Sequence, residues 1–222
     1  MTWLPYALLL CAAIFYISDN LEFQAPLDDA FISYRYARNL ADGHGLVFNA
    51  GERVEGYTNL LWTLLVACAI GLGFDAPVAG HAFGVIGGLM CIGATFVLAR
   101  SLLPEKYRLL AGVAPWILVL SVPFSFWATS GLETALFSAF ITAALAAQVL
   151  GLPLLAIASA VGAVLTRPDG LLVGLVILAV HHMSHPWRSM RTWVPLGLFG
   201  LSIMLLTAFR LLYYHALVPN TY

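Results

Sequence analysis

Apolar residues gather along the chain in eight runs, at about 2–18, 58–74, 78–99, 109–124, 134–150, 152–166, 170–184 and 194–213. Most of these runs approach the length of about 20 residues that an α-helix needs to cross a bilayer. Membrane-spanning strands would instead alternate apolar and polar residues over segments of about ten residues. The pattern therefore predicts an all-α integral membrane protein, built as a bundle of helices with polar connections.

Two short basic loops indicate how the chain passes through the membrane, because Lys and Arg in short loops stay on the cytoplasmic side. One loop carries Arg100, Lys106 and Arg108, and the other carries Arg188 and Arg191. If all eight runs cross and the N-terminus is cytoplasmic, both loops fall on the wrong face. If the run at 57–73 lies in the interface, or dips in and returns, both loops are cytoplasmic. We therefore expect a bundle of about seven transmembrane helices.

The same path brings the polar segments together on the opposite face of the membrane. These segments are the first loop at 19–57, "SFWATSGLET" at 125–134, "RPDG" at 167–170 and "YYHALVPNTY" at 213–222. One extracytoplasmic face would then carry the chemistry, while the cytoplasmic face of the plasma membrane would carry the anchoring charge.

Composition agrees with a membrane protein and excludes other classes. Hydrophobic residues make up 61% of the chain and charged residues 9%, where a soluble domain carries about 25% charged residues. A net charge of -1, with ten scattered Lys and Arg residues, argues against nucleic acid as a partner. Cys11, Cys68 and Cys91 lie within or beside apolar runs, and we interpret them as packing residues rather than a disulfide.

The run "DDAFISYRYARNLADG" at 28–43 predicts an amphipathic, juxtamembrane helix in the first loop. Asp28 or Asp29 can cap the N-terminus of this helix, and Gly43 can supply its left-handed stop. An apolar stripe recurs at helical spacing and would rest on the bilayer; it consists of Phe31, Tyr34, Ala37 and Ala41. The other side of the helix carries Asp29, Ser33, Tyr36 and Asn39.

The adjacent carboxylates of Asp28 and Asp29 allow two interpretations. They can be a capping pair, or they can serve as a general base and its neighbour, since mutual repulsion and partial burial raise one pKa. His44, Arg53 and Glu55 in the same loop favour the second interpretation.

At these residues the chain resembles the polytopic glycosyltransferases of the C type, which take a sugar from a polyprenyl-phosphate carrier. The run "DDAFISYRYARNLADGHGLVFNAGERVEGYTNLLW" at 28–62 is most similar to the arabinofuranosyltransferases of actinobacterial cell walls. The later pieces "WATSGLETALF", "LTRPDGLL" and "YYHALVPNTY" agree in kind and order. Members of the family are usually at least twice as long, so we interpret residues 1–222 as the N-terminal transmembrane catalytic module of such an enzyme.

The resemblance implies that the protein transfers a sugar, with arabinofuranose as a candidate, to a glycan or lipid acceptor of the cell envelope. The transfer would invert the configuration at the anomeric carbon. It assigns the base that deprotonates the acceptor hydroxyl to Asp28, with Asp29 as neighbour or alternate. The leaving polyprenyl phosphate needs cations, and the candidates are Arg53, His44 and Arg167. Related transferases have Glu-Lys-Pro where this chain has Glu55-Gly56-Tyr57, so the lysine expected at the carrier phosphate is missing.

Arg167 and Glu133, in the later motifs, each allow two interpretations. Arg167 interrupts an apolar stretch, where a charge is expensive unless it is functional or paired, and the alternative is a local pair with Asp169. Glu133 is either an acid stabilised at a helix N-terminus or a contact to sugar hydroxyls. The donor-binding candidates are therefore His44, Arg53, Glu55, Glu133, Arg167 and Asp169.

No cofactor is required by this interpretation, although a divalent metal on Asp28, Asp29 and Glu55 is left open. The competing function is a transporter or flippase for a lipid-linked or small polar substrate. Such a protein would carry charged residues near the middle of several spans and show repeated halves. The sequence shows neither feature clearly, which favours the transferase.

Overall fold

The computed structural model describes residues 3–21, 26–184 and 190–221. Within them the chain is all-helical, with ten α-helices and one 3₁₀ helix and no strand. The helices are α1 (Leu4–Leu21), α2 (Ala30–Ala41), α3 (Leu60–Gly71), α4 (Ala76–Leu102), the 3₁₀ helix η1 (Glu105–Gly112), α5 (Ala114–Val119), α6 (Val122–Thr129), α7 (Thr134–Val149), α8 (Pro153–Thr166), α9 (Gly170–Ser184) and α10 (Met190–Tyr214).

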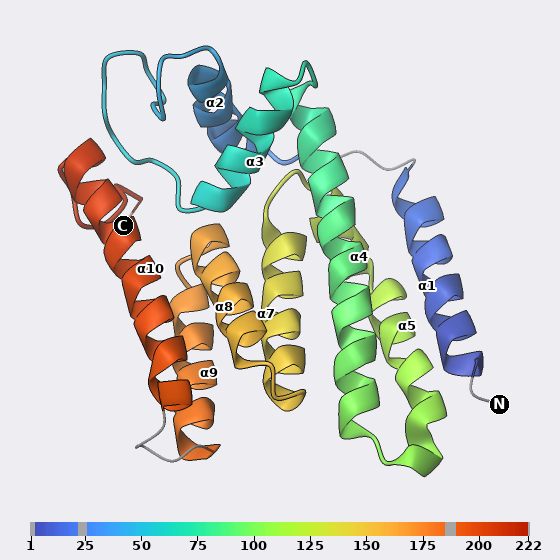
Figure 1. Cartoon of the computed structure of the whole chain (residues 1–222). Coiled ribbons are helices and arrows are strands. Elements are labelled where there is room, and N and C mark those ends of the chain that lie inside the picture. Colours follow the sequence, from blue (N-terminus) through green and yellow to red (C-terminus); the bar gives the residue numbers. More distant parts are fainter. Residues whose placement is uncertain (1–2, 22–25, 185–189, 222) are drawn as a thin grey trace.

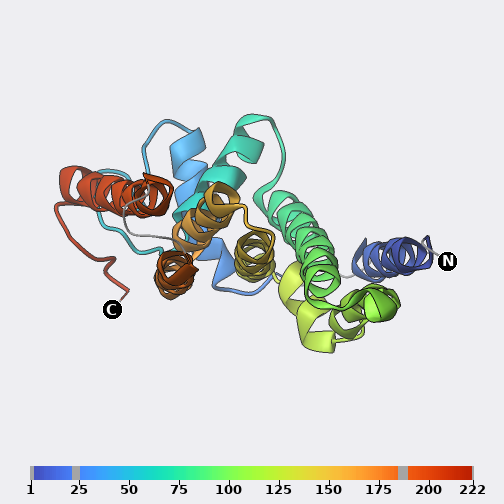
Figure 2. The same cartoon turned by 60° about the horizontal axis from the view of Figure 1, so that its bottom comes forward.

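The long helices lie roughly side by side, with α1 and α10 at opposite edges of the bundle (Figures 1 and 2). The helix α4 packs closely against α7 because small residues face each other there. A Cβ atom added to Gly87 of α4 would lie only 2.7 Å from the backbone nitrogen of Leu136 in α7. A second buried cluster joins α7, α8, α9 and α10 around Ile157, Ile177 and Phe199.

The prediction of about seven spans is met only in part. Within the described residues, three helices are long and apolar enough to cross a membrane: α1, α4 and α10. The helices α7, α8 and α9 form where apolar runs predict them, but they have 16, 14 and 15 residues. At 1.5 Å per residue they reach about 24, 21 and 22 Å, less than the roughly 30 Å of a hydrocarbon core.

The apolar run at 109–124 is not one straight helix, contrary to expectation. Two helical pieces, Glu105–Val119 and Val122–Thr129, meet at an angle of 63°, and together they form a broken span or a re-entrant turn. Pro123 lies at the start of α6. Because proline has no N–H group to continue a helical hydrogen-bond ladder, the chain changes direction there.

The helix α3, which covers most of the run expected to stay in the interface, has 12 residues and a length of about 18 Å. It lies obliquely between α2 and the upper ends of the bundle in Figure 1. Its length and position agree with a segment that does not cross.

The helix α2 forms as predicted and ends at Ala41; Asp42 is its C-cap residue, and Gly43 follows with φ +82°. Its apolar stripe does not simply rest on the bilayer, which corrects the expectation. Tyr34 and Ala37 are buried against Trp62 and Val66 of α3. An amphipathic pattern shows that one side of a helix is covered, but it does not tell lipid from a neighbouring helix.

Ser33 and Tyr36, expected on the polar side of α2, are also buried. Only Phe31 and Ala41 of the stripe are exposed. The three cysteines are free, and Cys91 alone of them is buried, so the packing role expected for all three holds within the protein only for Cys91.

Candidate functional site

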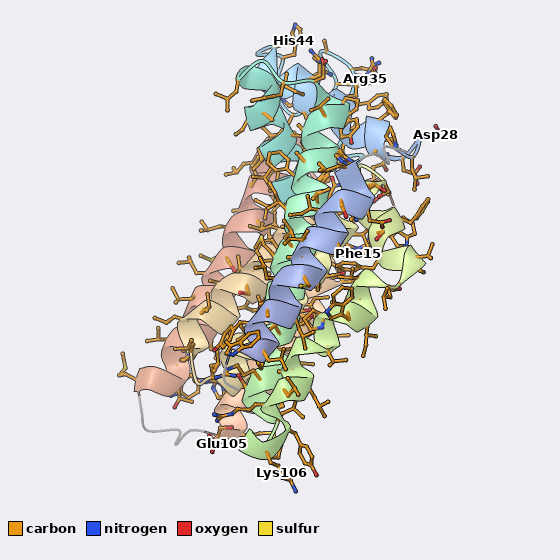
Figure 3. All side chains as sticks on the ribbon, turned by 90° about the vertical axis from the view of Figure 1, so that its right-hand side faces the viewer. Phe15, Asp28, Arg35, His44, Glu105 and Lys106 are labelled. Atoms are coloured by element: carbon orange, nitrogen blue, oxygen red, sulfur yellow. The ribbon has the colours of Figure 1, made fainter. Side chains whose placement is uncertain are left out.

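The polar segments lie at one end of the bundle. All are at the upper end in Figure 1: residues 26–29 before α2, the turn between α6 and α7, the turn between α8 and α9, and the end of α10. The basic loop that carries Glu105 and Lys106 lies at the other end, opposite His44 (Figure 3). Arg188 lies outside the described residues.

The acidic pair precedes the first turn of α2 and is held close to the bundle. The backbone N–H of Leu27 donates to the carbonyl oxygen of Ser130, 2.9 Å away, which ties this turn to the C-terminal end of α6. Asp29 occupies the N-cap position, yet its side chain makes no capping hydrogen bond. Both carboxylates are exposed, so the partial burial expected for them is wrong, and each is accessible to a ligand.

Asp28 lines a groove of about 500 Å³, called here the α2 groove. Its other lining residues include Phe31, Ile32, Arg35 and Arg38 of α2, together with Phe48 of the loop. Ala76 and Pro77, at the start of α4, also line it. In Figure 3 Asp28 and Arg35 lie on the same side of the molecule, with His44 apart from them at the top.

A second polar group, called here the Glu133 network, lies beneath α2 and α3. Glu133, at the start of α7, is 5% exposed and accepts a hydrogen bond of 2.8 Å from Asn59. Its other oxygen lies 3.0 Å from the guanidinium of Arg167. Asn59 also bonds to Ser33 of α2 and to Thr63 of α3, so the network joins four elements.

Arg167 also forms an ion pair with Asp169, at 3.4 Å, as the local alternative predicted. The Glu133 network therefore contains two carboxylates and one guanidinium. The net charge of these three side chains is negative and would repel a phosphate. This favours a structural role for Arg167 over direct contact with a phosphate. Glu133 already has a partner on each oxygen, which equally favours a structural role.

The long loop at 42–59 is fastened to the end of α10 by contacts called here the loop–helix clasp. Arg210 Nε lies 3.0 Å from both carboxylate oxygens of Glu55, which is 3% exposed. The Tyr214 hydroxyl donates to the carbonyl oxygen of Leu46, and the guanidinium of Arg53 lies 4.8 Å from the ring centre of Tyr213. These contacts bring two predicted site residues, Arg53 and Glu55, to the C-terminal helix.

Burial raises the pKa of the Glu55 carboxyl above its ordinary value, and the Arg210 guanidinium opposes that rise. Two tyrosines line the same part of the loop. Burial raises the pKa of Tyr36 and the pKa of Tyr57, so both hydroxyls stay protonated at neutral pH. Tyr36 accepts a hydrogen bond from the Gly56 backbone and donates one to Val54.

The structure thus brings Glu133, Arg167 and Asp169 together, and it places Arg53 and Glu55 in the clasp. His44 is exposed at the tip of the loop. No ion pair or side-chain hydrogen bond joins Asp28 or Asp29 to these residues within the described chain. The described residues contain no group of three or more His, Cys, Asp or Glu arranged to hold a metal, so Asp28, Asp29 and Glu55 do not form one.

Several residues of these groups were not singled out from the sequence. Arg210 interrupts the apolar run at 194–213, and the same rule that drew attention to Arg167 could have found it. Arg35 and Arg38 are three residues apart in α2 and so lie on one side of the helix, and Asp28 lies in the turn that precedes it. Asn59 carries no comparable signal, since its role depends on Glu133, 74 residues away.

Two known proteins are similar to the chain. A terminal β-(1→2)-arabinofuranosyltransferase of Mycobacterium tuberculosis (strain ATCC 25618 / H37Rv) is 33% identical over 215 residues, covering 87% of this chain and 34% of that protein. The protein of the same name from Corynebacterium glutamicum (strain ATCC 13032) is 60% identical over 35 residues, or 16% of this chain and 5% of that protein. The chain therefore spans about a third of the length of the first relative. No protein-family model and no solved structure matches it.

Proposed function

Because the chain is homologous to a terminal β-(1→2)-arabinofuranosyltransferase, we propose that it forms the membrane module of an inverting glycosyltransferase. The donor is a polyprenyl-phosphate-linked sugar, with arabinofuranose as the leading candidate, and the acceptor is a glycan or lipid of the cell envelope. The observation that carries the proposal is the exposed acidic pair, Asp28 and Asp29, at the polar end of an apolar helical bundle of such a homologue.

In this proposal Asp28 is the general base, and Asp29 is its neighbour or alternate. A base must reach the acceptor hydroxyl, and neither carboxylate is consumed by a cap or an ion pair within the described residues. The acceptor oxygen attacks the anomeric carbon from the side opposite the phosphate, which inverts the configuration. The bond to the phosphate oxygen breaks, and the hydroxyl proton passes to the carboxylate.

In the proposal, the remaining predicted site residues have two different roles: some are open to the donor, and others hold the shape of the site. His44 and Arg53 are exposed and accessible to the donor. Glu55, Glu133, Arg167 and Asp169 shape the site through their ion pairs, with Asp169 the most exposed of them. We place this end of the bundle outside the plasma membrane, since the basic residues Arg100, Lys106 and Arg108 lie at the other end.

The proposal also includes a crossing path for the shorter helices. The helices α7, α8 and α9 pack between longer neighbours, and a short span can be accommodated by local thinning of the bilayer. With the bent segment counted as one span and α3 in the interface, the path has seven crossings.

The test is transfer of radiolabelled sugar from a polyprenyl-phosphate donor in membranes that contain the full-length gene product. We expect Asp28→Asn to lower transfer by roughly 10²- to 10⁴-fold, the usual contribution of a general base. Asp42→Asn is the matched control, because Asp42 is an exposed carboxylate at the opposite end of α2.

Asp29→Asn separates the two carboxylates. Loss of transfer with Asp29→Asn alone would move the base to Asp29. Unchanged transfer with both substitutions would refute the acidic-pair mechanism. No transfer from any polyprenyl-phosphate donor by the unmodified protein would instead favour a transporter of lipid-linked substrates.

A further inference from the structure

The arginines at the polar end of the bundle differ in how far their charges are compensated. Arg167 and Arg210 each form an ion pair with a buried carboxylate. Arg35 donates only to uncharged oxygens, the Phe48 carbonyl at 2.7 Å and the Asn49 amide at 3.2 Å. The side chain of Arg38 has no hydrogen bond or ion pair with any residue of the described chain, and it is exposed.

Arg35 and Arg38 both line the α2 groove, and Asp28 is the carboxylate that lines it with them. The groove thus carries two guanidinium groups against one carboxylate, an excess of positive charge that suits an anion. A guanidinium is planar and presents parallel N–H donors, which match two oxygens of a phosphate. Arg35 is also held in place, since its guanidinium stacks 4.6 Å from the ring centre of Phe48.

Apolar side chains continue from the arginines toward the bundle. Phe31 is 50% exposed and Ile32 41% exposed on α2. Val78, in the first turn of α4, is 49% exposed and adjoins the groove residues Ala76 and Pro77. A ligand that combines a phosphate with a hydrocarbon chain would satisfy both halves of this surface, whereas a free phosphate would use only the arginines.

Asp28 and the two arginines line the same groove, which suits a sugar between the base and the cations. Asp28 lies in the turn that precedes α2, and Arg35 follows it by seven residues, in the second turn of the helix. A donor whose phosphate meets Arg35 and Arg38 would therefore direct its sugar toward Asp28, with no need for the compensated Arg167.

We propose that Arg35 and Arg38 bind the phosphate of the lipid-linked sugar donor in the α2 groove, with the lipid chain lying over Phe31, Ile32 and Val78. This inference rests on the proposed glycosyltransferase function and adds the residues that hold the donor. It replaces the missing lysine of the Glu-Lys-Pro motif with arginines from a different element.

The test is binding of a fluorescent polyprenyl phosphate to the purified full-length protein in phosphatidylcholine nanodiscs, measured without any transfer reaction. We expect Arg38→Gln to weaken binding about tenfold and the Arg35→Gln/Arg38→Gln double variant about a hundredfold, since hydrogen bonds to charged groups are strong. Arg38→Gln removes no hydrogen bond or ion pair within the described residues, so the variant should fold normally, and its loss of binding would point to the lost charge. Arg108→Gln, an exposed arginine at the opposite end, is the control.

Competition identifies the source of the phosphate. We expect unlabelled polyprenyl phosphate to displace the probe, while inorganic phosphate and phosphatidylglycerol compete at least tenfold less well. Equal competition by either one, unchanged binding by the double variant, or no binding by the unmodified protein would overturn the inference. Transfer activity that survives in the double variant would overturn the donor-binding inference and leave the proposed glycosyltransferase function intact. Binding that depends on the two arginines, in a protein that transfers no sugar, would support the binding site and overturn the proposed function.

Discussion

At the scale of single residues, the charged side chains of the candidate site are of two kinds. Some form ion pairs within the protein, and others are exposed and open to a ligand. Glu55 and Arg210 are 155 residues apart in sequence and meet at 3.0 Å, in a place where neither is well exposed to water. Breaking a buried ion pair by removing one partner costs about 3–5 kcal/mol, because the other charge stays buried without compensation. The clasp therefore depends on both partners.

We predict that Arg210→Gln lowers the stability of the folded protein by about 3 kcal/mol at neutral pH. The loss should shrink as the pH falls toward 4.5, the ordinary pKa of a glutamate, because burial raises the pKa of Glu55. The folded state then binds a proton that the unfolded state does not, so stability rises as the pH falls. Thermal unfolding of the purified protein at several pH values measures this.

The Arg210→Gln/Glu55→Gln double variant is the control, since it removes the charge that titrates. It should be more stable than Arg210→Gln at neutral pH and show a weaker dependence on pH. A pH-independent loss in Arg210→Gln would show that Glu55 is not the group left unpaired.

At the scale of elements, the apolar patterns predict where helices lie in the sequence better than they predict what each helix packs against. The apolar runs correctly predict α1, α4, α7, α8, α9 and α10, because each pattern is local and long. The pattern of α2 predicts a covered face but assigns it to lipid, whereas Tyr34 lies against α3 and donates a hydrogen bond to the Gly131 carbonyl. The apolar run at 109–124 does not predict the bend before α6, because apolar composition continues across Pro123.

The α4–α7 contact gives a prediction at this scale. Gly87→Ala should destabilise the protein by about 1–3 kcal/mol, since the added methyl meets the backbone of α7, which cannot move without separating the helices. Gly93→Ala, in the same helix, should be neutral or slightly stabilising, because a Cβ there has open space within 4 Å. Thermal unfolding of both variants in the same detergent makes the comparison, and equal effects would contradict close packing at Gly87.

At the scale of the whole molecule, the bundle separates two ends of different chemistry. The acidic pair, the Glu133 network and the clasp lie at one end, and the loop with Lys106 and Arg108 lies at the other (Figures 1 and 3). The sequence predicted this separation only on a path in which the run at 57–73 does not cross. The short oblique α3 agrees with that path.

Labelling with a membrane-impermeant maleimide tests the orientation in a variant whose native cysteines are replaced. We expect Ala50→Cys, in the exposed loop before α3, to react from outside intact cells. Lys106→Cys should react only after the cells are permeabilised. Labelling of Lys106→Cys alone in intact cells would show that the orientation is the reverse of the one proposed. Labelling of both variants in intact cells would show that the two positions do not lie on opposite faces of the membrane.

The sequence by itself determined the class of the protein, the places of most helices and the polar segments that gather at one end. These follow from local hydrophobicity and from charges in short loops, which depend on near neighbours in the chain. Only the tertiary structure decided which charges are matched: Glu55 meets Arg210, Glu133 meets Arg167 and Asn59, and Arg38 is left facing a groove. Such pairs depend on helix packing across many intervening residues, and a list of candidate residues does not contain that information.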